Sequence, residues 1–245
     1  MTYLVVGASA GVGRGLAARF AAAGHDLVLV ASDERDLVAM AADLGIRHGV
    51  RVCWVAADVG AGDAYLERIA LACTEMGGLD GLLLPVGMVA DDDDDCSFDP
   101  RRTTRLTAVN FGAIVAIVTR FLPELTARPR ATVVGFGSVA ATRGRQRNVA
   151  YSAAKRALES FFESLRHACV CSPVTVQLYV LGYVDSSLTI GLRTRIPMGT
   201  PEGVGDLVLG NIHRDVGTVY YPWFWRYLCL LVRHAPWWLF RRRAF

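Results

Sequence analysis

The sequence of 245 residues lacks the features that mark membrane-spanning, secreted and repeat proteins. It has no apolar run of about 18 to 20 residues, the length that a helix needs to cross a bilayer. The chain enters Tyr-Leu-Val-Val-Gly directly after Thr2, without the basic stretch and cleavage site of a secretory signal peptide. It also has no Pro/Ser-rich linker and no internal repeat. We therefore expect a single domain without a spanning helix.

Metal-ligand spacing and strong charge are missing as well. The six cysteines are scattered, and Cys169-Val-Cys171 has no second Cys/His pair at the spacing of a zinc site. We expect no metal and a reducing, cytoplasmic compartment. The net charge is only +3, which does not suggest a nucleic-acid groove. Hydrophobic residues make up 53% of the chain, enough for a large core, which excludes a disordered or fibrous protein.

Short apolar segments, many rich in β-branched residues or leucine, alternate with longer helical patterns. The segments expected to be strands are residues 3–6, 26–30, 50–56, 81–84, 131–136, 174–180 and 218–221. Strands that alternate with helices predict βαβ units and a parallel sheet covered on both faces. We predict an α/β, Rossmann-type fold: a doubly wound, seven-stranded parallel sheet in three layers, formed by residues 1–222 as one domain. The longest helices are expected at 103–127 and 149–168.

Tyr151-Ser-Ala-Ala-Lys155 carries the chemistry, together with Ser138, which lies thirteen residues before the tyrosine. Residues four apart on a helix lie on one face, so the phenol and the ammonium act on one site. The lysine charge favours the phenolate and is expected to lower the pKa of Tyr151 towards neutrality. A hydroxyl at Ser138, at the end of the preceding strand, can polarise a carbonyl or an alcohol. The three residues predict a carbonyl/alcohol redox site.

A glycine-rich loop follows the first expected strand and leads into a helix: Gly7-Ala8-Ser9-Ala10-Gly11-Val12-Gly13. Glycines in this position permit a tight turn and let the backbone approach a pyrophosphate, which the helix N-terminus then stabilises. Glycine also closes turns for structural reasons, so the loop indicates a dinucleotide because of its place between strand and helix.

The end of the second strand, where the two nicotinamide cofactors are distinguished, has a mixed composition. Ser32 can donate to either cofactor, Arg35 favours a 2′-phosphate, and Asp33 and Glu34 oppose it. The cofactor is therefore NADP(H) or NAD(H), with NADP(H) favoured because Ala31 is not acidic. Asp58, after the third strand, is expected either to contact the adenine or to cap a helix.

These residues together resemble the short-chain dehydrogenase/reductase family over residues 3 to 222. The matching positions are Gly7, Gly11, Gly13, Asp58, Asn110, Ser138, Tyr151 and Lys155. The resemblance implies that Tyr151 is the general acid/base, that Lys155 lowers its pKa and binds the nicotinamide ribose, that Ser138 orients the substrate oxygen, and that Asn110 holds a water. It also implies cofactor contacts at Gly7, Ser9, Ala10, Gly11, Val12, Gly13, Ser32, Asp58, Val59, Gly87, Tyr151, Lys155, Gly182 and Val184.

The chain departs from the family in three places. The family's Asn-Asn-Ala-Gly is Leu84-Pro85-Val86-Gly87 here, and its Pro-Gly is Leu181-Gly182, with Ser186 in place of the usual threonine. The segment that covers the substrate, from Val184 to the helix near Pro201, has only about sixteen residues. A short cover predicts an open site for a bulky or carrier-linked substrate.

Substrate-lining candidates are Val139, Ala140, Arg143, Arg145, Asn148 and Tyr183. Arg143, Arg145 and Arg147 suit a phosphate or carboxylate, or belong to a solvated loop. The run Asp91 to Asp95 is expected in a solvated loop, with attraction of a cationic substrate or a metal as the alternative.

Residues 223–245 form a C-terminal helical tail that contains four of the five tryptophans and ends in Arg241, Arg242 and Arg243. Trp and Arg favour a membrane interface, and equally a clasp over the pocket or a subunit contact. The tail is similar to the ends of some short-chain reductases that act on lipid-linked sugars.

The sequence thus predicts an NAD(P)-dependent oxidoreductase that interconverts a secondary alcohol and a ketone. An isomerase or epimerase with retained cofactor and a non-catalytic dinucleotide-sensing binder are the alternatives. Ser138, Tyr151 and Lys155 argue against the binder. The expected partners are a small-molecule or carrier-linked substrate, further copies of the chain in a homo-oligomer, and a membrane surface touched peripherally by the tail.

Overall fold

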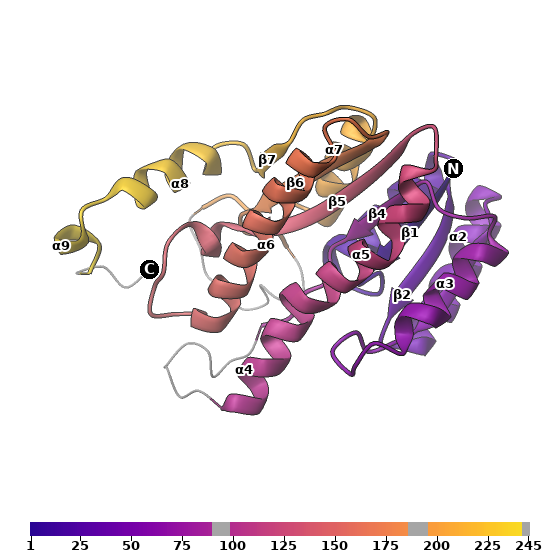
Figure 1. The fold of residues 1–245 in the computed structure, drawn as a ribbon, viewed down its shortest axis with the longest axis horizontal. Helices are drawn as coiled ribbons and strands as arrows, with labels where there is room; N and C mark the ends of the chain where they lie inside the picture. The colour runs from indigo at the N-terminus through magenta and orange to yellow at the C-terminus, as the bar shows by residue number, and fades with distance from the viewer. Residues whose placement is uncertain (90–98, 186–195, 242–245) are drawn as a thin grey trace.

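The computed structural model describes residues 1–89, 99–185 and 196–241. Seven parallel strands form one sheet in the order β3-β2-β1-β4-β5-β6-β7 (Figure 1). The strands are β1 (Thr2–Val6), β2 (Asp26–Ala31), β3 (Val52–Ala56), β4 (Gly81–Leu84), β5 (Ala131–Ser138), β6 (Val174–Leu181) and β7 (Thr218–Tyr221). The order reverses between β1 and β4, the crossover at which doubly wound sheets bind ligands. The predicted fold class is confirmed.

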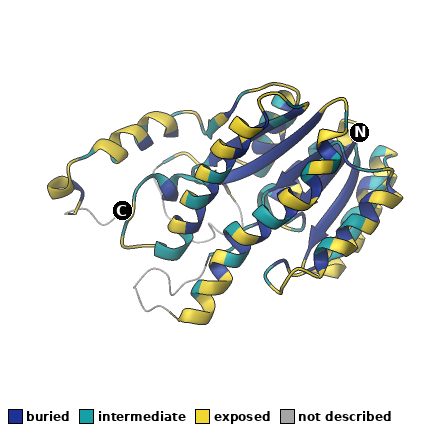
Figure 2. Ribbon diagram, in the orientation of Figure 1, coloured by how far each residue is buried: buried dark blue, intermediate teal, exposed yellow. Residues whose placement is uncertain are grey.

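Alternation along each strand divides the core between two layers of helices. In β1, Tyr3 and Val5 face one layer, while Leu4 and Val6 face the other. The first layer consists of α1 (Gly11–Ala22), α2 (Glu34–His48) and α7 (Pro201–Asn211). The second consists of α3 (Tyr65–Glu75), α5 (Ala113–Thr126) and α6 (Val149–Ala168). Figure 2 shows the strands between them as buried.

A π-helical turn interrupts the helix that the sequence predicts over 103–127. The structure has α4 (Pro100–Thr107), the π-helical turn Ala108–Gly112 and then α5. Residues Pro100–Thr126 are long and apolar enough to cross a membrane by length and composition, contrary to the expectation that no such stretch exists. The α5 portion supplies buried residues to the core, from Ile114 to Leu125, as the central helix of a folded domain does.

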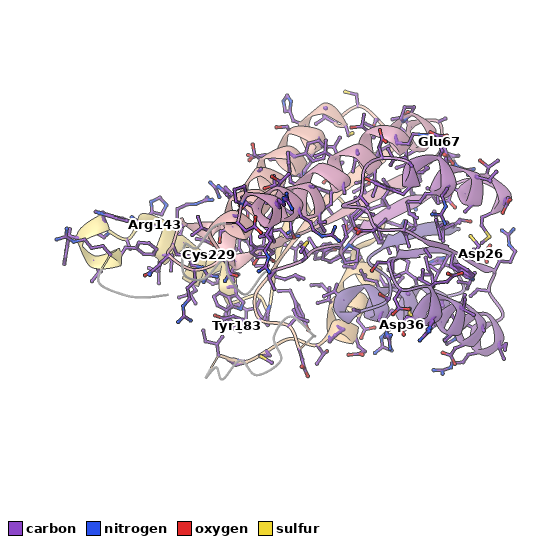
Figure 3. The ribbon with its side chains drawn as sticks, turned by 90° about the horizontal axis from the view of Figure 1, so that it is seen from below. Asp26, Asp36, Glu67, Arg143, Tyr183 and Cys229 are labelled. Carbon is purple, nitrogen blue, oxygen red and sulfur yellow. The ribbon has the colours of Figure 1, made fainter. Side chains whose placement is uncertain are left out.

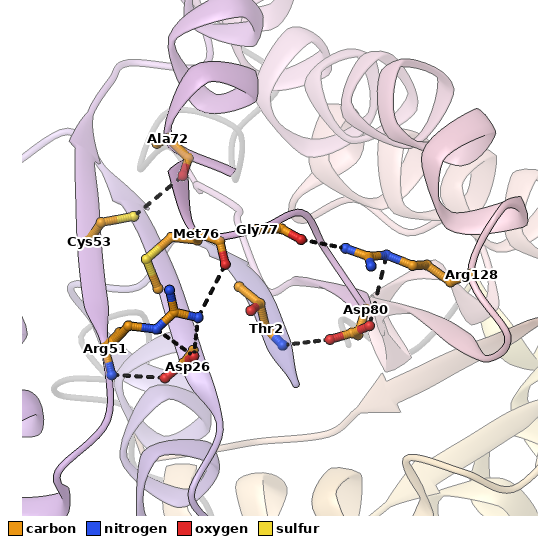
Figure 4. Close-up of polar contacts among 9 residues, drawn as sticks. All are labelled: Thr2, Asp26, Arg51, Cys53, Ala72, Met76, Gly77, Asp80 and Arg128. Atoms are coloured by element: carbon orange, nitrogen blue, oxygen red, sulfur yellow. Dashed lines mark hydrogen bonds and ion pairs between the residues drawn. The ribbon is translucent and has the colours of Figure 1, made fainter. Parts of the chain in front are cut away.

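Polar contacts tie together the amino ends of the strands (Figure 4). The Arg51 guanidinium lies 2.7 Å from the Asp26 carboxylate and also donates to the Met76 carbonyl. Arg51 N donates to Asp26 Oδ1 at 2.8 Å instead of entering the ladder, so β3 begins at Val52 and not at the expected residue 50. These contacts lie at the amino ends of the strands. The candidate functional residues lie at the opposite, carboxyl ends, here called the carboxyl edge of the sheet.

The tail forms α8 (Trp225–His234) and α9 (Trp237–Phe240), which extend away from the sheet beyond β7 (Figure 1). Helix α8 contacts the short 3₁₀ turn Val139–Thr142 that follows β5. The tail therefore lies at the carboxyl edge of the sheet.

Candidate active site

The glycine-rich loop makes a tight turn at the carboxyl end of β1. Gly7 has φ +88°, and the amides of Gly7 and Ala8 both donate to the Val30 carbonyl. A Cβ on Gly13 would lie 1.9 Å from the Gly7 carbonyl oxygen. The first turn of α1 therefore packs so closely against the loop that only glycine fits at this position.

The N-terminus of α1 is open to an anion. Ala10 occupies the N-cap position without a side chain that can cap, and the first turn contains no acidic residue. Arg14 donates twice to the Ser9 carbonyl, at 3.1 and 2.8 Å, and pairs with Asp36 at 3.2 Å. Sequence reasoning missed Arg14, although a cation in the first turn after a glycine loop is a visible signal. Uncapped amides and a nearby guanidinium suit a phosphate.

The segment after β2 uses one of its acidic groups structurally. Asp33 Oδ1 accepts from the amides of Arg35 and Asp36, at 2.9 and 3.2 Å, and so caps α2. Ser32, just before it, is exposed. The Asp33 carboxylate therefore belongs to the helix cap, which reduces its opposition to a 2′-phosphate.

Asp58 does not cap a helix, contrary to one of its two expected roles. It accepts from the Gly60 amide at 2.9 Å in a turn, whereas α3 begins only at Tyr65. Arg105 of α4 lies 2.7 Å from the other carboxylate oxygen, and these hydrogen bonds hold the pKa of Asp58 below its usual range. Val59, beside it, is buried.

Asn110, Lys155 and Gly87 meet at the carboxyl end of β4. The Asn110 side chain is fully buried, accepts from the Met88 amide and donates to the Met88 and Leu106 carbonyls. A Cβ on Gly87 would lie 3.0 Å from Asn110 Oδ1 and 3.4 Å from Lys155 Nζ. Asn110 sits in the π-helical turn, a distortion found often at functional sites. These three residues share one corner although they are far apart in the sequence.

Lys155 is buried, and its Nζ donates to the Phe136 carbonyl at 3.1 Å. Burial lowers the pKa of Lys155 from 10.5 to about 8. The same nitrogen lies 6.0 Å from the centre of the Tyr151 ring, on the shared helix face that the spacing predicts.

Tyr151 and Ser138 are linked by a side-chain hydrogen bond, and Ser138 Oγ also accepts from the Ala140 amide at 3.2 Å. Burial raises the pKa of Tyr151, while this hydrogen bond and the charge of Arg145 act in the opposite direction. The expectation that Lys155 brings the pKa of the phenol down is therefore not met in this structure. The desolvation of the largely buried phenol outweighs the charge of Arg145.

Arg143 has a role that differs from the expected anion contact. Its guanidinium donates to the carbonyls of Val232 and Ala235 and lies 4.3 Å from the centre of the Phe240 ring. It thus joins the C-terminal end of α8 to α9, and Figure 3 shows it where the tail meets the body. Arg147 is exposed.

The carboxyl end of β6 is covered by the tail. The Gly182 amide donates to Tyr221 at 2.8 Å, and Val184 is buried. Trp225 of α8 lies directly on Gly182, with its ring edge-on to Tyr183 at 5.6 Å. The expected sites at Asp91 to Asp95, Ser186, Arg242 and Arg243, and most of the short covering segment, lie outside the described residues.

Comparisons with known proteins give a consistent result. The family model described as "short chain dehydrogenase" matches residues 1–196. The chain is 32% identical to the Hydroxysteroid 11-beta-dehydrogenase 1-like protein of Xenopus tropicalis, over 97% of this chain and 86% of that one. It is 35% identical to an uncharacterized oxidoreductase of Myxococcus xanthus, over 91% and 87%. A short-chain dehydrogenase from Sphingobium yanoikuyae, solved with NADPH, superposes with a TM-score of 0.80 at 26% identity, over 90% and 87% of the two chains.

Proposed function

The chain belongs to the short-chain dehydrogenase family, an oxidoreductase family, and we propose that it interconverts a secondary alcohol and a ketone with NADP(H). The observation that carries this proposal is the position of Tyr151. Its phenol is hydrogen-bonded to Ser138 and lies on the same helix face as Lys155. A positioned tyrosine in this setting suits a reaction that moves a proton at an oxygen.

The residues divide the chemistry among them. The nicotinamide cofactor supplies the hydride in reduction and takes it up in oxidation. Ser138 donates a hydrogen bond to the substrate oxygen, and Tyr151 gives that oxygen its proton in reduction or removes it in oxidation. Lys155 would hold the ribose hydroxyls of the cofactor, and the charge of Arg145 favours the phenolate. Asn110, whose amide is bound to the backbone of Met88, supports the proton path from Lys155.

The cofactor loop supports NADP(H) over NAD(H). Arg14 is anchored beside the loop, Asp33 is engaged as a helix cap, and Ser32 is exposed between the loop and α2. The relative from Sphingobium yanoikuyae was solved with NADPH, which agrees with this choice.

A bulky, largely apolar ketone is the substrate class that we favour. The aromatic tail packs beside Gly182 at the carboxyl edge, where a substrate has to lie next to the nicotinamide. The name of the relatives, hydroxysteroid dehydrogenase-like proteins, points to alicyclic alcohols and ketones of this kind.

Thermal denaturation with NADPH and with NADH tests the cofactor first. At a ligand concentration of about 100 times the Kd, binding adds about 2.7 kcal/mol, which raises Tm by roughly 5 to 10 °C in a domain of this size. A panel of alicyclic ketones is then followed at the nicotinamide absorbance band, with Tyr151→Phe as the control. No shift with either cofactor would overturn the proposal, and product formed without a change in absorbance would indicate an epimerase.

We also propose that the tail touches an anionic membrane surface. Large apolar side chains are exposed along it: Trp223, Tyr227, Leu230, Leu231, Trp237, Trp238 and Leu239. Figure 2 shows most of both tail helices as exposed. No acidic residue follows Asp215, whereas five arginines do, which complements anionic lipid.

Sedimentation with phosphatidylserine-containing and purely zwitterionic vesicles tests this contact. The variant Trp223→Ser/Leu231→Ser/Trp238→Ser removes apolar area from the tail without touching Trp225. The control Val38→Ser/Ile46→Ser/Leu71→Ser removes exposed apolar side chains elsewhere. We expect only the tail variant to lose binding to the anionic vesicles. Equal binding of both variants to the anionic vesicles would refute the membrane contact. Conversion of a dimer to a monomer by the tail variant, seen in light scattering, would assign the exposed surface of the tail to a subunit contact.

A further inference from the structure

Trp225 is buried, yet its indole N–H has no hydrogen-bond partner among the described residues. The side chain is only 6% exposed, whereas its neighbour Trp223 is 73% exposed. Trp225 Nε1 is one of four buried side-chain nitrogen or oxygen atoms in the described residues that make no hydrogen bond. Folded proteins satisfy nearly all buried donors, because an unmade hydrogen bond costs free energy. The N–H is therefore a candidate donor to a bound molecule.

The indole lies at the carboxyl edge of the sheet, beside the residues already assigned to the reaction. A Cβ on Gly182 would lie 1.9 Å from Trp225 Nε1 and 2.3 Å from its Cδ1. Gly182 directly follows Leu181, which pairs with Ser138 across β5 and β6. Trp225 Nε1 thus lies against the residue that directly follows the strand partner of Ser138.

The indole is held rigidly in this position. Its ring is edge-on to Tyr183 at 5.6 Å and stacked with Phe224 at 5.8 Å. One turn further along α8, Cys229 is buried and hydrogen-bonds with Thr142 of the 3₁₀ turn after Ser138. Arg143 then fixes the end of the same helix. A donor held by these contacts is preorganised, which is what specificity requires.

A second donor without a partner lies near the phenol. Arg145 Nε is buried and makes no hydrogen bond, and the charge of Arg145 acts on Tyr151. Two of the four such atoms therefore belong to residues around one site. Trp225 Nε1 and Arg145 Nε are both N–H donors. A molecule that binds them must therefore offer acceptor oxygens.

We infer that Trp225 Nε1 donates a hydrogen bond to a second oxygen of the substrate, distinct from the oxygen that undergoes reduction, so that the tail selects oxygen-bearing alicyclic ketones. This inference rests on the proposed function. The same acceptor chemistry is present in the carboxamide of the nicotinamide, and the experiment separates these two sources.

The test compares hydroxycyclohexanones and hydroxydecalones with the methyl-substituted ketones of the same ring positions. The variants are Trp225→Phe, which removes the N–H and keeps an aromatic ring, and Trp223→Phe as an exposed control. kcat/KM is measured with NADPH, and Kd by calorimetry in the presence of NADP⁺. In the wild type and in Trp223→Phe we expect a preference for the hydroxy ketone of about tenfold at one ring position, equivalent to about 1.4 kcal/mol. In Trp225→Phe the ratio falls to about one, even where both absolute rates decrease.

The indole ¹⁵N–¹H spectrum supplies a readout that does not need turnover. The signal of Trp225 is identified by its loss in Trp225→Phe. It should move downfield when the hydroxy ketone is added to the NADP⁺ complex, and not on addition of NADP⁺ alone. Movement with NADP⁺ alone would assign the N–H to the carboxamide, and an unchanged ratio in Trp225→Phe would refute the inference. Absence of any ketone binding or turnover in the wild type would instead refute the proposed function.

Discussion

Lys155 is the only lysine in the sequence, so one atom can be followed through a whole titration. It is 4% exposed, and its Nζ donates to the Phe136 carbonyl at 3.1 Å. We predict that the ammonium titrates near pH 8 in the cofactor-free protein, because burial disfavours its charged form.

The magnitude follows from the change in pKa. Since one pKa unit corresponds to about 1.4 kcal/mol, a decrease from 10.5 to about 8 corresponds to about 3 kcal/mol. Below pH 8 both the folded and the unfolded chain carry the charge, and the folded state bears the cost of burying it. Between pH 8 and 10.5 the unfolded chain holds more protons, so this contribution to stability becomes more favourable as the pH rises.

Replacement by methionine tests the sign of this effect. Lys155→Met keeps the volume and removes the buried cation, but it loses the hydrogen bond to Phe136, worth about 1 kcal/mol. We expect a net stabilisation of about 2 kcal/mol at pH 7, or roughly 4 to 8 °C in Tm. The gain should reach zero at about pH 10, where the remaining cost of the buried charge equals that of the lost hydrogen bond, and should become a loss of about 1 kcal/mol well above pH 10.5. The variant should be inactive.

The assay uses lysine labelled with ¹³C at Cε, which gives a single side-chain signal. Its chemical shift is recorded from pH 6 to 11, and the thermal denaturation of wild type and Lys155→Met is compared at several pH values. Lys155→Arg, which keeps the charge at every pH, is the control and should lack the increase in stability that the wild type shows between pH 8 and 10.5. A midpoint near 10.5, or destabilisation by methionine at pH 7, would refute the burial argument.

Three further predictions concern the same edge of the sheet. Tyr151→Phe should lower kcat by about 10² to 10⁴ but keep most of the increase in Tm with NADPH, because it removes the proton donor and only one of the many expected cofactor contacts; normal turnover would exclude this tyrosine. Arg145→Gln removes a charge that favours the phenolate, so the acidic limb of the pH profile for alcohol oxidation, where the phenolate becomes protonated, should move up by about one pH unit, while the exposed Arg147→Gln leaves it in place. Gly13→Ala places a Cβ 1.9 Å from the Gly7 oxygen and should abolish the Tm increase with NADPH, whereas Gly24→Ala, with nothing within 4 Å but φ +79°, should cost stability alone.

Sequence patterns predicted the strands well because the five inner strands are short apolar runs that are buried on both faces, and the edge strands β3 and β7 are partly buried apolar runs. The prediction failed where side chains from distant elements decide the local hydrogen bonding. Asp26 captures the Arg51 amide and delays β3, and the Met88 backbone binds Asn110 within the π-helical turn. Apolar spacing does not reveal either contact, since both depend on residues more than twenty positions away in the chain.

The difference between local patterns and contacts of distant residues also explains which features of the site could be predicted. The spacing of Tyr151 and Lys155 is local, and the helix places them together as expected. Their pKa values depend on burial, which is a property of the whole fold, so the expected direction for Tyr151 was wrong. Arg143 contacts residues of the tail 89 and 92 positions later, and no local pattern distinguishes it from Arg147.

The two faces of α8 explain how one aromatic segment can serve two purposes. Trp225 and Cys229, one turn apart, are buried against Gly182 and the 3₁₀ turn, whereas Tyr227 and Leu231 are exposed on the other side. The sequence alone left membrane contact, a clasp over the pocket and a subunit contact as alternatives, and an amphipathic helix accommodates the first two together. If both proposals hold, lipid contact on the outer face keeps the mouth of the site next to the membrane. An apolar ketone would then enter from the lipid side, and Trp225 would bind its second oxygen at the inner face.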